Sequence, residues 1–417
     1  MPIPTLDQSP IASDDRAHTI SPAATFTSLA RIPLVPDKVL KRHGAYCAID
    51  TRYRSAARLG QSLWLRGQGI PTAFAARRDG PPNAPNAFGS ILSPEAARAG
   101  KNFLTPAIHR RVLQELLMRE DDAAIDEWRL FGNALSSMPM LFNLLAPLAS
   151  DRELATAVFR RLMPAFVHSV EKIIFEHSPG RRDNRFLQDR TAFDAAICVI
   201  TPDGELATLY VETKLSESME GPAARMRDRY NEASRLVRLY REPDSALLRS
   251  VALEQIWRIH MTAQLAVDHG VTARAVFIGI APRLNRRVQA AFRVYQSELL
   301  DLDDRDDRRV GFVPLTLETI IEAIADAGGS ELARALWGRY CDFGDVYRLS
   351  MEELIDSPEL REPNVQRAIG PTLQGTNKST LPAIRRRRSV SNRHRTKVAP
   401  VAKGRPTRRK AKQEVAR

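Results

Sequence analysis

Three short segments rich in β-branched and apolar residues follow one another in the middle of the chain, and they constrain the fold more than any other feature. They are Val170–Ser178, Phe193–Ile200 and Ala207–Leu215, each bounded by Pro, Gly or Asp. The last two flank the pentapeptide TPDGE, in which Pro fixes φ and Gly accepts a positive φ. The sequence therefore predicts three strands, with a β-hairpin whose turn is centred on Asp203.

The register of this hairpin places two acidic residues opposite each other. Asp194 lies nine residues before the centre of the turn and Glu212 lies nine after it. Their carboxylates then share one face of the hairpin, with Cβ atoms about 5 Å apart. Lys214, two residues beyond Glu212, points to the same face. Because the neighbouring positions on both faces are largely apolar, we expect two like charges held close together with limited water.

A divalent cation between the two acids relieves their repulsion. Carboxylate oxygens with open water positions are what Mg²⁺ prefers, and Mn²⁺ is the alternative. A second interpretation is an ordinary cross-strand ion pair between Lys214 and one acid, and the loose pattern D-x₁₇-ExK leaves both open. The three Cys residues lie far apart without a CxxC, and the eight His residues form no HxxxH cluster. We therefore expect neither a zinc site nor a His-bound metal.

The segments around the three strands predict a mixed α/β layer. An apolar segment at Met138–Ala149 is broken by Pro139 and Pro147, and a helix that starts after Asp151 is expected to reach about residue 170, with a stop or kink at Pro164. Two more strands are predicted at Ala273–Ala281 and Val310–Thr316. Further helices are predicted near residues 106–117, 222–240, 250–267, 286–300, 317–327 and 331–340.

Four stretches in this region carry a resemblance to known proteins. They are FNLLAPLA (residues 142–149), FEHSPGR (175–181), DRTAFDAA (189–196) and YVETKLSES (210–218). The chain resembles a family of bacterial restriction endonuclease-like proteins in the PD-(D/E)XK nuclease superfamily. The resemblance covers about residues 40 to 350, including IWRIH (256–260) and PLTLE (314–318). It implies an αβββαβ core, with a central mixed sheet flanked by helices.

Carried over to this chain, the resemblance implies that Asp194, Glu212 and Lys214 are the catalytic residues, and that Asp194, Glu212 and the backbone carbonyl of Thr213 bind the metal. The motif's Pro is absent, because Phe193 precedes Asp194, and the acid often found on the first helix is not evident. Glu176, at the end of the strand before the hairpin, is the candidate for a further metal ligand. The alternative is a surface or hydrogen-bonded glutamate beside His177.

Several other polar residues are not assigned to the site. His177 is interpreted as structural and Glu171 as solvated. Gln255 and Arg258 lie three apart on a predicted helix, and they either face the site or pack beside Trp257. The remaining arginines are expected to be exposed, with contact to a phosphate as the alternative: Arg181, Arg182, Arg225, Arg227, Arg229, Arg235 and Arg238.

The formal net charge of +13 is confined to the C-terminal tail. The segment from Ile384 to Arg417 holds fourteen Lys or Arg and one Glu, so the preceding 383 residues are neutral overall. A cationic tail on a neutral body predicts attraction to nucleic acid. The alternative is a solvated extension that serves solubility, and the charge does not separate the two.

Composition also sets the expected organisation and location. The start, MPIPTLDQSPIASDD, lacks a basic and apolar signal, and no apolar run approaches the length of a membrane span. We expect a cytoplasmic, nucleoid-associated protein without a membrane partner. Residues 1–35 are predicted to be disordered, 36–150 to be a mostly helical region packed on the core, 151–362 to be the nuclease-like core, and 363–417 to be a disordered basic tail.

These features together predict a Mg²⁺-dependent nuclease that hydrolyses DNA phosphodiester bonds in a restriction endonuclease-like manner. DNA is the expected partner of both the tail and the active-site cleft, and a homodimer is left open. The alternatives are a non-catalytic DNA-binding protein that retains the nuclease fold and an RNA-processing nuclease.

Overall fold

A computed structural model describes residues 26–76, 87–123, 125–219, 226–301 and 308–356. All of them belong to one compact unit, Met1–Glu362. Residues 1–25 of the predicted disordered start (1–35) and the predicted basic tail lie outside the described residues, whereas Ile32 and Val35 are buried in a hydrophobic cluster. Within the described ranges, no helix combines the length and apolarity that crossing a membrane requires.

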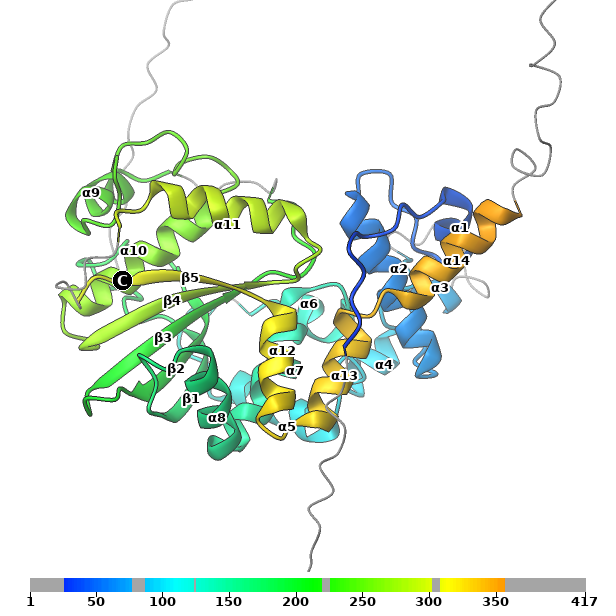
Figure 1. Cartoon of the computed structure of the whole chain (residues 1–417), viewed down its shortest axis with the longest axis horizontal. Helices are drawn as coiled ribbons and strands as arrows, with labels where there is room; N and C mark the ends of the chain where they lie inside the picture. Colours follow the sequence, from blue (N-terminus) through cyan, green and yellow to red (C-terminus); the bar gives the residue numbers. More distant parts are fainter. Residues whose placement is uncertain (1–25, 77–86, 124, 220–225, 302–307, 357–417) are drawn as a thin grey trace, which may run out of the picture. The chain divides into compact units, whose positions relative to one another are not determined.

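The sheet has five strands in the spatial order β1-β2-β3-β4-β5 (Figure 1). Neighbours pair in antiparallel fashion from β1 to β3 and in parallel fashion from β3 to β5. With a helix before β1 and helices between β3 and β4, this is the predicted αβββαβ core, and the mixed α/β class is confirmed. The strands are β1 (Ser169–His177), β2 (Phe193–Ile200), β3 (Leu206–Thr213), β4 (Arg274–Ala281) and β5 (Gly311–Thr316).

The hairpin of β2 and β3 has the register that the sequence predicts. Its pairs run from Ala195↔Val211 to Ile200↔Leu206, so the turn is centred on Asp203. The N–H of Gly204 donates to the carbonyl of Thr201 at 2.9 Å. Gly204 has φ +88°, a conformation that favours glycine because it has no Cβ.

Helices cover both faces of the sheet because successive strand residues bury apolar side chains on opposite sides (Figure 1). Leu209 and Ile278 belong to the core on one face, whereas Tyr210 and Phe277 belong to the core on the other. The first core includes residues of α7 (Ser137–Ser150), α8 (Arg152–Leu162), α12 (Leu317–Asp326) and α13 (Ser330–Tyr340). The second includes residues of α9 (Asp228–Leu236), α10 (Glu254–Asp268) and α11 (Arg286–Glu298).

The alternation breaks at the start of β2. Strict alternation along the strand would place Phe193 on the same face as Ala195, but its ring stacks on Tyr210 with centroids 4.0 Å apart, in the core of the opposite face. The described pairing of β2 with β3 ends at Ala195. Beyond that point β2 pairs only with β1, through His177↔Phe193, and the ring follows the apolar packing.

Helices before β1 contribute to the same compact unit. They are α1 (Asp37–Arg42), α2 (Arg52–Gly67), α3 (Ala73–Ala76), α4 (Pro94–Arg98), α5 (Pro106–Leu117) and α6 (Glu127–Gly132), and α14 (Gly344–Ile355) follows α13. The individual helices α2 and α14 were not predicted. The side chain of Gln61 in α2 donates to the carbonyl of Arg339 in α13 at 2.7 Å, which ties this region to the helices beside the sheet.

Two expectations about proline are wrong in detail. Pro139 and Pro147 do not break the apolar segment, because α7 runs through both. Pro139 lies in the first turn, where an N–H has no intrahelical partner, and Pro147 lies in the last turn. Conversely, α8 does not continue past Pro164: it ends at Leu162, and β1 begins at Ser169. Proline removes a helical hydrogen bond and restricts the residue before it.

Candidate active site

A cavity of about 400 Å³ brings together three carboxylates from three neighbouring strands. Glu176 comes from β1, Asp194 from β2 and Glu212 from β3. The cavity is also lined by Asp189, Arg190, Thr191, Ala192, Arg227, Tyr230, Gln255, Arg258 and Ile259. The two acids that the hairpin register predicts to lie together therefore do face a common space.

Asp194 is held in place by the strand beside it. Its Oδ2 atom accepts hydrogen bonds from the backbone N–H and the side-chain hydroxyl of Thr213, both at 2.7 Å. The carboxylate thus satisfies a strand N–H just beyond the last β2–β3 pair. Burial raises the pKa of Asp194, although Lys214 and the Thr213 donors act in the opposite direction. Its second oxygen accepts no hydrogen bond from the described residues.

Glu212, Lys214 and Gln255 form a closed triangle of hydrogen bonds. Lys214 Nζ donates to Glu212 Oε1 at 2.6 Å and to Gln255 Oε1 at 2.8 Å, and Gln255 Nε2 donates to Glu212 Oε1 at 2.9 Å. Burial, and then the charge of Asp194, raise the pKa of Glu212 to about 8 against the pull of Lys214. Burial lowers the pKa of Lys214, but its carboxylate neighbours outweigh burial and raise it overall.

Glu176 has an unusual backbone for a strand residue. Its φ is +48°, in the left-handed region that residues with a Cβ rarely adopt. Such strain costs about 1–3 kcal/mol, and it clusters at functional sites where the surrounding structure enforces it. Burial and the nearby Asp194 raise the pKa of Glu176 to about 7. The structure thus places Glu176 inside the cavity rather than on the surface.

The chemistry of these donors fits a hard divalent cation. All three acids offer oxygen, and burial together with mutual repulsion disfavours their ionised forms. Glu212 keeps Oε2 free of hydrogen bonds from the described residues, as Asp194 keeps Oδ1. In the ranges that the structure describes, no three His, Cys, Asp or Glu residues form a group that could hold a metal ion. Asp194 and Glu212 each keep an oxygen open to a cation, and Glu176 lines the same cavity.

Comparison with known protein families agrees with this geometry. The family model described as the PD-(D/E)XK nuclease superfamily matches residues 48–342, which is more than half of the chain. The chain belongs to the PD-(D/E)XK nuclease superfamily. No curated protein matches this sequence. No solved structure matches it either. Membership of the superfamily supports a hydrolase that acts on phosphodiester bonds of nucleic acid.

The residues assigned by resemblance to the superfamily motif do not all line the cavity. Asp194 and Glu212 line it, whereas Thr213 and Lys214 are buried behind it and contact those two acids. The roles of Lys214 in catalysis and of the Thr213 carbonyl as a metal ligand stay predictions. Gln255, one of the residues weighed earlier, faces the site.

The loop after β1 corrects one expectation about exposure. Arg181 is not exposed: its side chain is 7% accessible, and it donates to Glu120 Oε2 at 3.3 Å. His177 Nδ1 lies 2.8 Å from the other oxygen of Glu120, consistent with a structural role. Arg182 is exposed as expected and pairs with Asp122. Glu120 had not been singled out, because a lone glutamate after a helix carries no signal of its partners.

Sequence reasoning missed most of the polar wall of the cavity. Arg227 is exposed as expected, and it also lines the cavity together with Arg190 and Arg258. The three-residue spacing of Gln255 and Arg258 on α10 was the one available signal, since it places both on one side of a helix.

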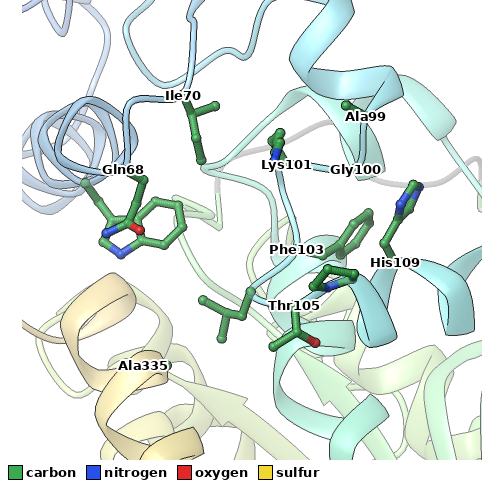
Figure 2. A pocket seen from close by; sticks show the side chains of 12 residues that line it. Gln68, Ile70, Ala99, Gly100, Lys101, Phe103, Thr105, His109 and Ala335 are labelled. Atoms are coloured by element: carbon green, nitrogen blue, oxygen red, sulfur yellow. The ribbon is translucent and has the colours of Figure 1, made fainter.

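A second cavity, of about 390 Å³, lies among the helices outside the sheet. Figure 2 shows Lys101, Phe103 and His109 around it. It is lined as well by Trp64, Gln68, Ile70, Ala99, Gly100, Leu104, Thr105, Pro106 and Ala335. None of these lining residues is a carboxylate, so this cavity lacks the ligands that nuclease chemistry in the superfamily needs. The carboxylate cavity is the candidate active site.

Proposed function

We propose that this protein is a metal-dependent nuclease that hydrolyses phosphodiester bonds of DNA, with Asp194, Glu212 and Lys214 as its catalytic residues. The observation that carries the proposal is the meeting of strand-borne carboxylates in one cavity, with a buried lysine bonded to one of them. Repelling acids in a buried place lower stability, and a metal-binding role explains why they are there.

Asp194 and Glu212 are the residues proposed to hold Mg²⁺, or Mn²⁺ as the alternative, with Glu176 and the Thr213 carbonyl as further ligands. A divalent cation bound there supplies charge neutralisation for the phosphate and lowers the pKa of a water molecule. The Thr213 hydrogen bonds fix the direction of the Asp194 carboxylate. A fixed ligand pays less ordering entropy when it binds.

Lys214 is proposed to orient the attacking water or to stabilise charge that develops on the phosphate. Glu212 and Gln255 accept hydrogen bonds from its Nζ atom and hold the ammonium group inside the protein. In a buried site such a fixed charge acts more strongly than in water, because little solvent screens it.

The test is cleavage of plasmid DNA with Mg²⁺ and with EDTA, by wild type, Asp194→Ala and Lys214→Ala. The matched control is Glu171→Ala, which removes an acid of β1 that is half exposed and paired with Arg152 outside the cavity. We expect Mg²⁺-dependent cleavage by wild type and the control, and none by the other two. Equal activity of all four proteins would refute the assignment.

The same assay addresses the alternatives. A non-catalytic DNA-binding protein would retain affinity in EDTA and show no turnover with any divalent metal, and an RNA-processing nuclease would prefer RNA of matched sequence. The intact set of Asp194, Glu212 and Lys214 favours catalysis.

The basic tail is proposed to add non-specific DNA affinity. The homodimer, the nucleoid location and the division at residues 35, 150 and 362 also stay proposals.

A further inference from the structure

We propose that Arg190 and Arg227 form a phosphate-binding site at the rim of the carboxylate cavity, where they hold the sugar-phosphate backbone of the substrate strand. The inference rests on the proposed function for the identity of the substrate as a nucleic acid. It assigns a ligand, the phosphodiester anion, to two residues that the catalytic set does not include.

The three cavity arginines differ in whether their charge is already balanced. Arg258 is mostly buried and pairs with two acids: Nε contacts Glu254, and Nη1 lies 3.1 Å from Asp189 Oδ2. Nη1 also donates to Thr191 Oγ1 at 2.6 Å. Its Nε and Nη1 donors are therefore occupied and its charge is balanced by two carboxylates, which indicates a structural role for Arg258.

Arg190 and Arg227 have no such partner. Among the residues described, neither forms a salt bridge with a carboxylate. Arg227 donates to the neutral carbonyl of Gln188, and Arg190 is exposed and influences Asp122 only through its charge. Both nevertheless line the same cavity as the three carboxylates. Two cations thus remain available at the mouth of an acidic site.

Hydrogen bonds hold the residues on both sides of Arg190. Gln188 has a left-handed φ of +55°. Next to it, Asp189 accepts hydrogen bonds from the N–H and hydroxyl of Thr191, at 2.9 and 2.8 Å, and from the hydroxyl of Tyr230 at 2.8 Å. Burial would raise the pKa of Asp189, but these bonds and the charge of Arg258 outweigh it and lower the pKa.

The hydrogen bonds of Asp189 and Thr191 fix the backbone position of Arg190 between them. Because Asp189 and Thr191 are fixed on both sides of it, the backbone of Arg190 loses little freedom when its side chain binds. A guanidinium binds the oxygens of a phosphate through two parallel hydrogen bonds. The acids of the cavity repel a phosphodiester, and two unpaired guanidinium groups at the rim oppose that repulsion. The unpaired charges of Arg190 and Arg227 and the hydrogen-bonded loop around Arg190 both favour a phosphate as the ligand.

The experiment measures binding separately from cleavage. Full-length wild type, Arg190→Ala, Arg227→Ala and the double variant are titrated onto a fluorescein-labelled DNA duplex by anisotropy, in EDTA and over a range of salt concentrations. The matched control is Arg235→Ala, on the same helix as the residues after Arg227 but outside the cavity and paired with Asp244. Arg190→Lys keeps the charge without the planar fork, and circular dichroism checks that each variant is folded.

We expect each alanine variant to bind about three- to tenfold more weakly, and the slope of log Kd against log salt to fall by about 1 per phosphate contact. Arg190→Lys should retain the slope and lose part of the affinity. If both alanine variants bind with the affinity and slope of Arg235→Ala, or if wild type does not bind DNA, the phosphate site is wrong. Wild type that binds with the expected differences but never cleaves would overturn the proposed function and leave this site standing.

Discussion

The Nζ atom of Lys214 lies 2.6 Å from Oε1 of Glu212, in a pair whose side chains are only 7% and 4% exposed. The two residues are separated by one position on or just after β3, and Gln255 of α10 closes the contact from the other side. Removing one partner of such a pair leaves the other charge buried, which is strongly unfavourable unless that group changes its protonation. The effect of substituting either residue therefore depends on whether the remaining partner can become neutral.

Replacing Lys214 by methionine should abolish cleavage and leave the fold intact. Glu212 has a pKa already raised to about 8, so it can take up a proton when its partner is lost. Loss of a fixed charge at the reacting centre costs about 10²- to 10³-fold in rate. Single-turnover cleavage and a thermal melt measure the two effects. A melting temperature that falls with the rate would show a structural role only.

Replacing Gln255 by leucine should reduce cleavage without eliminating it. The amide bridges Lys214 and Glu212, and the loss of a residue that orients a metal ligand typically costs 10- to 100-fold in activity or metal affinity. Activity is measured against Mg²⁺ concentration. Gln114→Leu, at an exposed position of α5, serves as the control. An unchanged Mg²⁺ dependence in Gln255→Leu would contradict the bridging role.

Asp194→Asn should make the protein more stable when no metal is present. The substitution removes one of the mutually repelling acids and keeps an oxygen that can accept from Thr213. In EDTA we expect a rise in melting temperature. Wild type should gain stability when Mg²⁺ is added, because a ligand that binds only the folded state stabilises it, and the variant should not. A variant that still responds to Mg²⁺ like wild type would count against Asp194 as a ligand.

Glu176→Gly should stabilise the fold and impair activity, because glycine adopts the φ of +48° without a Cβ penalty. Relief of the strain is worth about 1 kcal/mol. Glu176→Gln is the matched variant, since it keeps the strain and loses the charge. Chemical denaturation measures the effect of the backbone strain on stability, and cleavage assays measure the effect of losing the carboxylate on activity. If Glu176→Gly is no more stable than Glu176→Gln, the strain does not reside at this residue.

Stability should fall in acid because of His260, outside the candidate site. Burial lowers the pKa of this imidazole to about 4, and its nitrogens contact the Tyr295 hydroxyl and the Val310 carbonyl. The unfolded chain takes up this proton near pH 6.5, so stability is lost as pH falls from 6.5 to about 4, by about 3 kcal/mol in all. Urea denaturation at pH 7 and pH 4.5 tests this, and His260→Gln should lose less stability between them than wild type does.

The sequence predicts the strands and the hairpin well because their causes are local. Pro202, Asp203 and Gly204 determine the turn, and the turn determines which residues face each other across it. The partnership of Asp194 and Glu212 follows from that register alone. The strand bounds at β2 match the prediction, since Pro, Gly and Asp mark the ends of the apolar run.

What could not be predicted depends on how distant elements pack. Helix α2 buries Arg58, Gln61 and Ser62 beside its apolar side chains, and polar residues on the buried face of a helix are not evident from the sequence. The positions of Arg227 and Arg258 depend on how α9 and α10 dock on the sheet, which residue spacing within one helix does not specify. Phe193 follows tertiary packing rather than strand alternation for the same reason.

The hydrogen bonds from Thr213 to Asp194 give a function to the residue between Glu212 and Lys214 in the ETK triplet. In a bare E-x-K pattern that letter is a spacer that sets the direction of its two neighbours. Here its hydroxyl steers an acid on the adjoining strand, so a shape-matched valine would remove one tether while the backbone tether remains. Few substitutions of Thr213 should therefore be tolerated, and serine is the one that keeps the hydroxyl hydrogen bond to Asp194.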